Sequence, residues 1–200
     1  MTRKRLVLAA AIIAIVGLAA AGTNAYTTAE AHTTNVITTG AVNITLNDAI
    51  VGGEQVSAGW ELAGVMPGVD VEKTVSVTNV GPGDAWVRVK VDTAITPGEN
   101  VKPKEKLNPG MVTFDVGEGW IPGDDGCYYY SLPMKAGETT PNLFSLVSFS
   151  PKMDNDYQGC TVTMTVSAQA VQVKNNDNGG DLTELTEESF SQVQGWPAES

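Results

Sequence analysis

Residues 71–93 read VEKTVSVTNVGPGDAWVRVKVDT, and polar residues alternate with small or β-branched ones on both sides of the central GPGD. A period of two with one apolar face is typical of a half-buried β-strand. The residues between the two runs are Gly, Pro, Gly and Asp, which accept the backbone angles of tight turns. We therefore expect residues 71–93 to form an antiparallel β-hairpin.

The alternation also predicts which side chains of this stretch are buried, because successive side chains of a strand point to opposite faces. The odd-numbered residues of 71–79 share one face, which includes Lys73 and Asn79 among valines. The odd-numbered residues of 85–91 share the apolar face of the second run, whereas Trp86 falls on its polar face. The residues expected in the core are Val75, Val77, Val87, Val89 and Val91.

Further strands are expected along the chain, separated by clusters of Gly, Pro, Asn and Asp. Their ranges are 36–46, 112–116, 127–132, 143–150 and 161–173. Almost no segment after residue 34 has the 3.6-residue period of a helix. About seven or eight short strands with such turns predict an all-β protein built as a two-sheet antiparallel β-sandwich.

The start of the chain has the order of a secretory signal peptide. Basic residues at 3–5 precede an apolar run over 6–21, which is shorter than the roughly 20 residues of a membrane-spanning helix. Thr23 and Ala25 supply the small residues of a cleavage site, so we expect signal peptidase to cut before Tyr26. The alternative is an N-terminal membrane anchor that is not cleaved. Cleavage predicts a secreted protein without stable membrane insertion.

The expected domain boundaries follow from these patterns. Residues 1–25 are the signal peptide, 26–34 an extensible N-terminal segment, 35–173 the sandwich and 174–200 a polar linker with a short helical tail. In the tail, Asp181 can cap the helix, and Leu182, Leu185 and Val193 can share one face, joined by Trp196. This tail either docks on the sandwich or remains a mobile appendage.

The charge of the chain limits its partners. The 200 residues carry a formal charge of −11, and loss of the three basic residues before position 26 changes it from −11 to −14. Nucleic acid and anionic membrane surfaces would repel such a chain, so we expect neither as a partner. Solubility outside the cell is the simplest reason for the acidity, and attraction of divalent cations is the alternative.

Three blocks of sequence resemble the TasA/camelysin family of exported bacterial proteins. The first is Gly22-Thr23-Asn24-Ala25-Tyr26, followed by Asn35 and by Thr39-Gly40 before a strand. The second is VMPGVD at 65–70, followed by VSVTNVG at 75–81 and AWVRV at 85–89. The third is DYQG at 156–159 before the last long strand. Members usually carry Phe and an acidic residue soon after Ala-Tyr, whereas Thr27-Thr28-Ala29 follow here.

The resemblance implies a jelly-roll-like sandwich released by a dedicated signal peptidase, and a subunit or accessory of biofilm matrix fibres. It also implies head-to-tail assembly with copies of itself or with a related fibre protein, in which a freed N-terminal strand adds to the edge of a neighbouring sandwich. The residues of this donor segment are Tyr26, Thr28, Ala29, Ala31 and Thr33. The alternatives are a disordered leader and, for the whole protein, a monomeric module that binds cell-surface polysaccharide.

Catalytic and metal sites find little support in the sequence. The single histidine, His32, lies close to the cleavage site, so no Ser-His-Asp triad can form in the sandwich, and the HExxH zinc helix is absent. Camelysin relatives have been described as metalloproteases, but no metal-binding residues for that activity are found here. We therefore expect neither an enzyme nor a metal or cofactor. The loop Asp154–Gly159 imitates a calcium loop in part, and a polar turn is the preferred interpretation there and at Asp124-Asp125.

Cysteine and aromatic residues leave two questions open. Cys127 and Cys160 either form a disulfide, as an exported protein allows, or are two separate buried thiols. Tyr128, Tyr129 and Tyr130 and the four tryptophans could offer flat rings to a sugar or could fill the core. On a strand, the middle ring of the three tyrosines points away from its two neighbours.

Overall fold

A computed structural model describes residues 36–38, 42–50, 54–56, 59–103, 106–174, 176 and 179–196 of the chain. Within them the chain forms strands and three short 3-10 turns, and no α-helix. The strands are β1 (Val36–Thr38), β2 (Ile44–Ile50), β3 (Glu54–Val56), β4 (Gly59–Ala63), β5 (Asp70–Asn79), β6 (Ala85–Thr96), β7 (Val112–Phe114), β8 (Trp120–Pro122), β9 (Cys127–Tyr130), β10 (Phe144–Phe149) and β11 (Thr161–Gln172). The 3-10 turns are η1 (Pro109–Met111), η2 (Asn155–Tyr157) and η3 (Phe190–Gln192).

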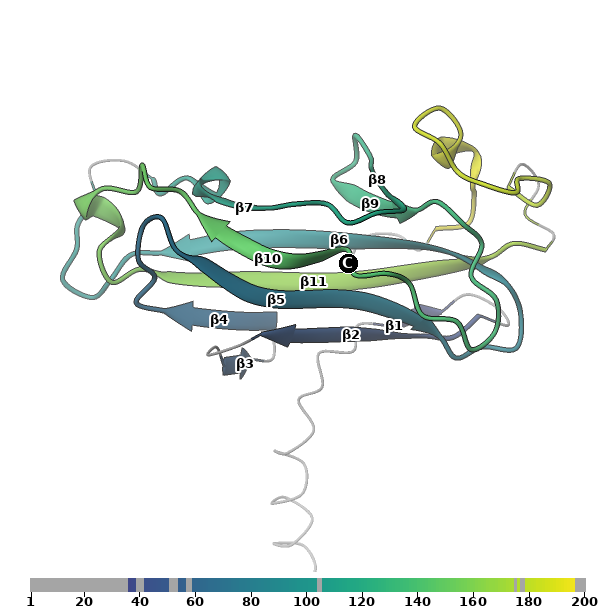
Figure 1. Ribbon diagram of the computed structural model, residues 1–200, viewed down its shortest axis with the longest axis horizontal. Coiled ribbons are helices and arrows are strands. Elements are labelled where there is room, and N and C mark those ends of the chain that lie inside the picture. Colours follow the sequence, from purple (N-terminus) through teal and green to yellow (C-terminus); the bar gives the residue numbers. More distant parts are fainter. Residues whose placement is uncertain are drawn as a thin grey trace, which may run out of the picture. The chain divides into compact units, whose positions relative to one another are not determined.

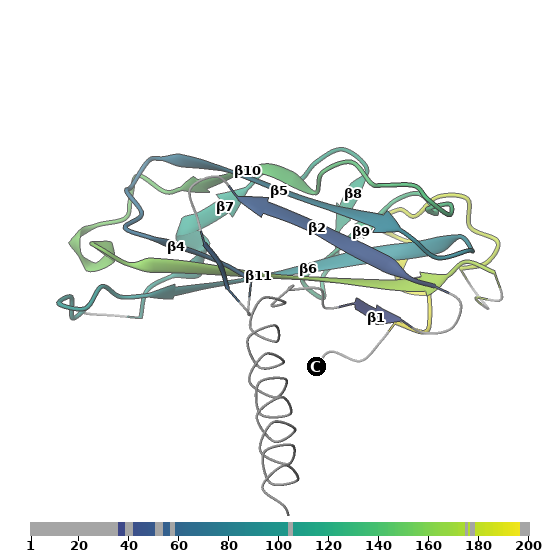
Figure 2. The ribbon, with the colours of Figure 1, turned by 90° about the horizontal axis from the view of Figure 1, so that it is seen from below.

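The strands form two sheets packed face to face (Figures 1 and 2). The larger sheet, sheet A, has the order β3-β4-β11-β6-β9-β8, and β1 joins it by a parallel pairing with β11. The smaller sheet, sheet B, has the order β2-β5-β10-β7. All described pairings except that of β1 with β11 are antiparallel. The expected all-β, two-sheet sandwich is therefore confirmed.

The chain passes repeatedly from one sheet to the other. It runs from β4 in sheet A to β5 in sheet B, returns to β6 in sheet A, and later crosses from β9 to β10 and back to β11. This alternation places the last strand, β11, at the centre of sheet A. β11 pairs with β6 along all of its length, from Thr161↔Thr96 to Gln172↔Ala85.

The expected hairpin over residues 71–93 is wrong. β5 pairs with β2 and β10 in sheet B, whereas β6 pairs with β11 and β9 in sheet A, so residues 81–84 form an arch between the sheets. The amide of buried Asn79 organises this arch. Its Nδ2 donates to the carbonyl oxygens of Gly83 (2.9 Å) and Met134 (3.0 Å), and its Oδ1 accepts from the Gly81 N–H (3.0 Å).

The predicted faces of the two strands are nevertheless correct. Val75, Val77, Val87 and Val89 have no exposed surface, and Val91 is half-buried against the same core. Lys73 and Asn79 lie on this inner face as well, and both are fully buried. An arch turns the apolar faces of β5 and β6 toward each other across the core, whereas a hairpin would have placed them side by side.

The remaining expectations hold in part. The ranges expected near 112, 127, 143 and 161 correspond to β7, β9, β10 and β11, and the range 36–46 covers β1 and the start of β2. Three short strands, β3, β4 and β8, were not expected. The C-terminal helix is reduced to η3 (Phe190–Gln192), and residues 182–186 after Asp181 form no helical turn.

Replacement of Val89 tests the inner face. We expect Val89→Ala to lower the free energy of unfolding by about 1–3 kcal/mol, because it removes buried methyl groups and leaves a cavity. Val80→Ala is the matched control, since Val80 is 52 % exposed, and its effect should stay within about 0.5 kcal/mol. Denaturant unfolding of the two variants measures the difference, and equal midpoints would contradict the assignment.

Candidate functional site

The residues expected at the cleavage site and in the donor segment lie outside the described part of the chain. They are Thr23, Ala25, Tyr26, Thr28, Ala29, Ala31 and Thr33. The first described element after them is β1, which pairs in parallel with β11 in the register Val36↔Ala168 to Thr38↔Ala170. The segment that leads out of the predicted donor residues is thus a strand of sheet A.

The side of β11 that receives β1 is shared between two short strands. β4 pairs with β11 at Thr161–Met164, and β1 pairs with it at Ala168–Ala170. β1 also contacts β2, the outer strand of sheet B, and Figure 2 shows the two on the same side of the sandwich. We call β1 and β2 together the N-terminal edge.

β2 is the longest edge strand in the described residues. It has seven residues and pairs on one side only, with β5, from Ile44↔Asn79 to Ile50↔Lys73. The other strands at the edges, β1, β3, β7 and β8, have three residues each. Short edges offer few main-chain groups to another strand, whereas a longer one can accept a complete strand. The N-terminal edge is therefore the candidate site for strand addition.

The two cysteines are buried and are not joined. Cys127 pairs with Lys90, which pairs on its other side with Ser167 of β11. Cys160 precedes β11, so the two cysteines are separated along the strands by roughly 20 Å. A disulfide requires α-carbons within about 7 Å. Of the two alternatives, two separate buried thiols are found, and burial raises the pKa of the Cys160 thiol.

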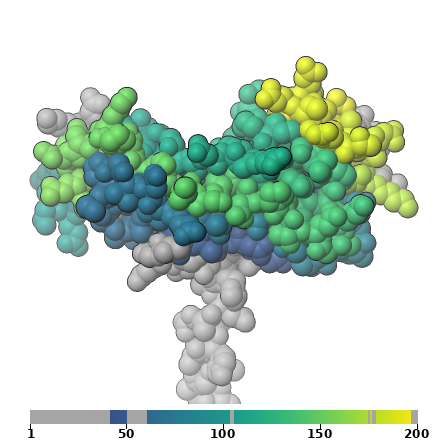
Figure 3. All heavy atoms as spheres, in the orientation of Figure 1, coloured from purple at the N-terminus to yellow at the C-terminus, as the bar shows by residue number. Residues whose placement is uncertain are grey.

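A second apolar cluster lies on the outer face of sheet A, beneath the C-terminal residues. Trp86 has no exposed surface, although its strand face was expected to be polar. Leu185 and Val193 of the tail are buried in the same cluster, with Leu182, Phe190 and Trp196 packed around it. The docked tail, shown in yellow in Figures 1 and 3, covers Trp86, whose Nε1 donates to the Gly179 carbonyl oxygen (3.0 Å). Docking, one of the two alternatives for the tail, is confirmed.

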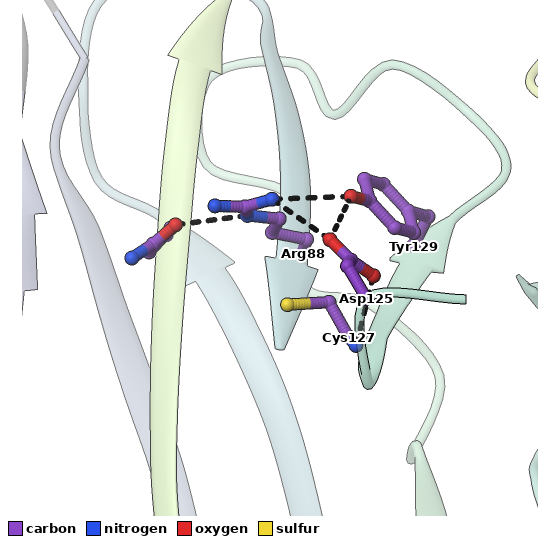
Figure 4. A network of polar contacts seen from close by, with 5 residues as sticks. Arg88, Asp125, Cys127 and Tyr129 are labelled. Atoms are coloured by element: carbon purple, nitrogen blue, oxygen red, sulfur yellow. Dashed lines mark hydrogen bonds and ion pairs between the residues drawn. The ribbon is translucent and has the colours of Figure 1, made fainter. Parts of the chain in front are cut away.

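Arg88 supplies the polar centre of this outer cluster (Figure 4). Its Nε donates to Gln169 Oε1 (2.8 Å), and its Nη1 donates to Asp125 Oδ2 and to Tyr129 Oη (both 3.1 Å). The Tyr129 hydroxyl in turn donates to Asp125 Oδ2 (2.6 Å). The guanidinium lies 4.8 Å from the Trp196 ring centre, within the range of a cation–π contact. Three strands and the tail are joined through one side chain.

These contacts shift two pKa values in opposite directions. Burial and the hydrogen bond to Asp125 raise the pKa of Tyr129 to about 12, although Arg88 opposes the shift. Burial alone would raise the pKa of Asp125, but the Tyr129 hydroxyl, the Cys127 N–H and the charge of Arg88 lower it below its usual value. The cluster is therefore stable as a neutral phenol, a carboxylate and a guanidinium.

Tyr129 is buried, and Tyr128 and Tyr130 are half-buried against other side chains. Tyr129 stacks on Phe190 beneath the tail, with ring centres 4.6 Å apart. Tyr128 and Tyr130 point the opposite way, as expected, and pack against Phe114 and Trp120 of the main core. These three tyrosines do not share an exposed face.

The acidic loops behave as polar turns. Asp154 caps η2 by accepting from the Asp156 N–H (3.0 Å), and Asp125 belongs to the Arg88 cluster. In the described part of the chain, no three His, Cys, Asp or Glu side chains are grouped as metal ligands would be. The same residues form no helix with the length and hydropathy of a membrane span.

Comparisons of the chain with protein-family models, with curated proteins and with solved structures found no match.

Tail docking can be tested at Leu185, which is 1 % exposed. We expect Leu185→Ala to weaken docking by about 2 kcal/mol or more, because it leaves a cavity in the buried cluster beneath the tail. A protease that cuts after Glu184, Glu187 and Glu188 should then cleave the tail at least about tenfold faster. Thr183→Ala, at an exposed position, is the control and should leave the rate unchanged. Equal cleavage of the two variants would mean that Leu185 does not hold the tail.

The pKa values predict how the cluster responds to pH. A raised phenol pKa stabilises the fold below pH 10, the ordinary tyrosine value, and this contribution is lost as the pH rises through about 12. The lowered pKa of the Asp125 carboxyl stabilises the fold above pH 3.8, its ordinary value. This contribution is lost as the pH falls below 3.8. Spectrophotometric titration should show a tyrosine that ionises near pH 12 and that disappears in Tyr129→Phe. Tyr157→Phe, the control, should retain it.

Proposed function

We propose that this protein is an exported structural subunit or accessory of extracellular fibres, and that it assembles by adding its N-terminal segment as a strand to the next copy. The resemblance of its signal region and strand blocks to the TasA/camelysin family motivates the proposal. The observation that carries it is the N-terminal edge, where a long open strand lies beside the strand that leads out of the donor segment.

The donor segment has the reach and composition that the proposal requires. Residues 26–34 span about 30 Å when extended. They contain no Pro or Gly, and their only charged residue is Glu30 when His32 is neutral. Such a segment can supply a complete row of main-chain donors and acceptors, and its small side chains make few demands on the surface that receives it.

β2 of the next copy is the proposed acceptor. It is seven residues long, close to the length of the donor, and a strand added on the side away from β5 would continue sheet B. A contact between the N-terminus of one copy and β2 of another joins two different surfaces. Repetition of such a contact does not close on itself and therefore produces filaments.

Proline substitutions in the donor test assembly. We expect prolines at Ala29 and Ala31 to abolish polymers while the sandwich stays folded, because proline removes the N–H that a β-ladder needs. Thr33→Val, which keeps the main chain intact, is the control and should polymerise. Electron microscopy and light scattering measure the polymers, and circular dichroism checks the fold. Filaments that persist in the proline variant would contradict strand donation.

The acceptor is tested in the same samples by hydrogen exchange. On polymerisation, amides of β2 should become protected, whereas those of β7 at the opposite edge of sheet B should not change. Protection at β7 instead of β2 would move the acceptor to the other edge. A monomeric polysaccharide-binding module would give no polymers in any variant.

A further inference from the structure

Lys73 and Asp48 form a buried pair on the inner face of sheet B. The Lys73 side chain has no exposed surface and that of Asp48 is 10 % exposed, and Lys73 Nζ donates to Asp48 Oδ1. In the register of β2 with β5, Asp48 is opposite Val75, and Lys73 is opposite Ile50. The two residues are therefore diagonal neighbours on one face of adjacent strands, within reach of each other.

The surroundings of this pair are apolar. Lys73 lines a small cavity whose other walls are aliphatic and aromatic, formed by residues such as Leu62, Phe149, Val162 and Met164. Two full charges in such a place are costly, because their hydration is lost and is repaid only in part by their attraction. Burial lowers the pKa of Lys73, although the hydrogen bond and the charge of Asp48 raise it in part. Compared with water, the apolar setting shifts both groups toward their neutral forms, an amine and a carboxylic acid.

We propose that Lys73 and Asp48 condense to an isopeptide bond that links β5 to β2. In the neutral pair, the lone pair of Nζ attacks Cγ of Asp48, and the bond from Cγ to the hydroxyl oxygen breaks. That hydroxyl leaves with one amine proton as a molecule of water, and a secondary amide remains. No oxidant, reductant or further reactant is needed.

Two physical conditions favour this step. The amine is held against the carboxyl by rigid neighbouring strands, and well-oriented groups in one molecule react as if their concentration were about 10⁵–10⁸ M. A desolvated lysine is also a better nucleophile than a hydrated ammonium. The product replaces two ionisable groups in an apolar cavity by one neutral amide, and the released water can leave the core. The inference rests on this pair alone and does not depend on the proposed function.

The cross-link would fix β2, the edge strand of sheet B, to its neighbour covalently. Hydrogen bonds with β5 otherwise hold this strand on one side only within the described residues. Local unfolding begins in segments that make few contacts with the rest of the protein, such as edge strands. A covalent link to β5 would protect β2 from it.

Mass spectrometry of the intact, denatured full-length chain tests the proposal. The folded protein should be lighter by one water molecule than the mass calculated from its sequence and its observed N-terminus. Digestion with trypsin should leave Lys73 uncut and yield a branched peptide that contains Asp48 and Lys73. Protein that is made unfolded, as inclusion bodies, should have the full mass and should lose one water on refolding.

Two variants exclude other sources of the mass loss. Asp125-Gly126 can lose water by forming a succinimide, so the difference must depend on Lys73. Lys73→Met should have its full calculated mass, whereas Lys135→Met, at an exposed position, should keep the loss of one water. The branched peptide from the unmodified sequence decides the matter even where Lys73→Met fails to fold. A folded protein of full mass, or a loss that persists in Lys73→Met, would overturn the proposal and leave an ion pair.

Discussion

The buried amide of Asn79 fixes the point at which the chain leaves one sheet and enters the other. It holds the arch at Gly81 and Gly83 and at the same time binds Met134, so two connections are joined at one end of the sandwich. A buried amide without these partners would cost several kcal/mol, which makes other paths for the chain unfavourable. The facing of β5 and β6 across the core, and hence the layering of both sheets, depends on this crossing.

The outer face of sheet A is covered by the C-terminal tail and forms a second buried cluster. Arg88 and Trp86 would be half-solvated on an ordinary sandwich, yet the C-terminal residues cover both. A buried guanidinium is stable only where its charge and donors are matched, and here Asp125, Tyr129 and Gln169 match them. The tail therefore belongs to the folded domain, and its removal would leave a cation and two aromatic rings uncovered.

Local patterns predicted the faces of the strands but not their partners. Alternation is a property of one strand, so the burial of Val75, Val77, Val87 and Val89 followed from sequence. A hairpin and an arch between β5 and β6 give the same alternation of polar and apolar residues. The sequence feature that distinguishes the arch is Asn79, a polar residue on the valine face shortly before the glycines. Trp86 was misplaced because the residues that cover it lie a hundred positions later. The pairing of β1 with β11 and the contact of Asp48 with Lys73 also depend on distant segments, which a single sequence does not reveal.

The central position of β11 has a consequence for the order of folding. β6 ends at Thr96, but the twelve-residue strand that pairs with it begins only at Thr161. β1 and β4 also pair with this last strand, so the middle of sheet A cannot close until nearly the whole chain is available. Such non-local pairing is slow, because the entropy of a long loop is lost before the strands at its two ends make stabilising contacts. A chain that is synthesised from its N-terminus therefore keeps sheet A open until residues 161–172 are available.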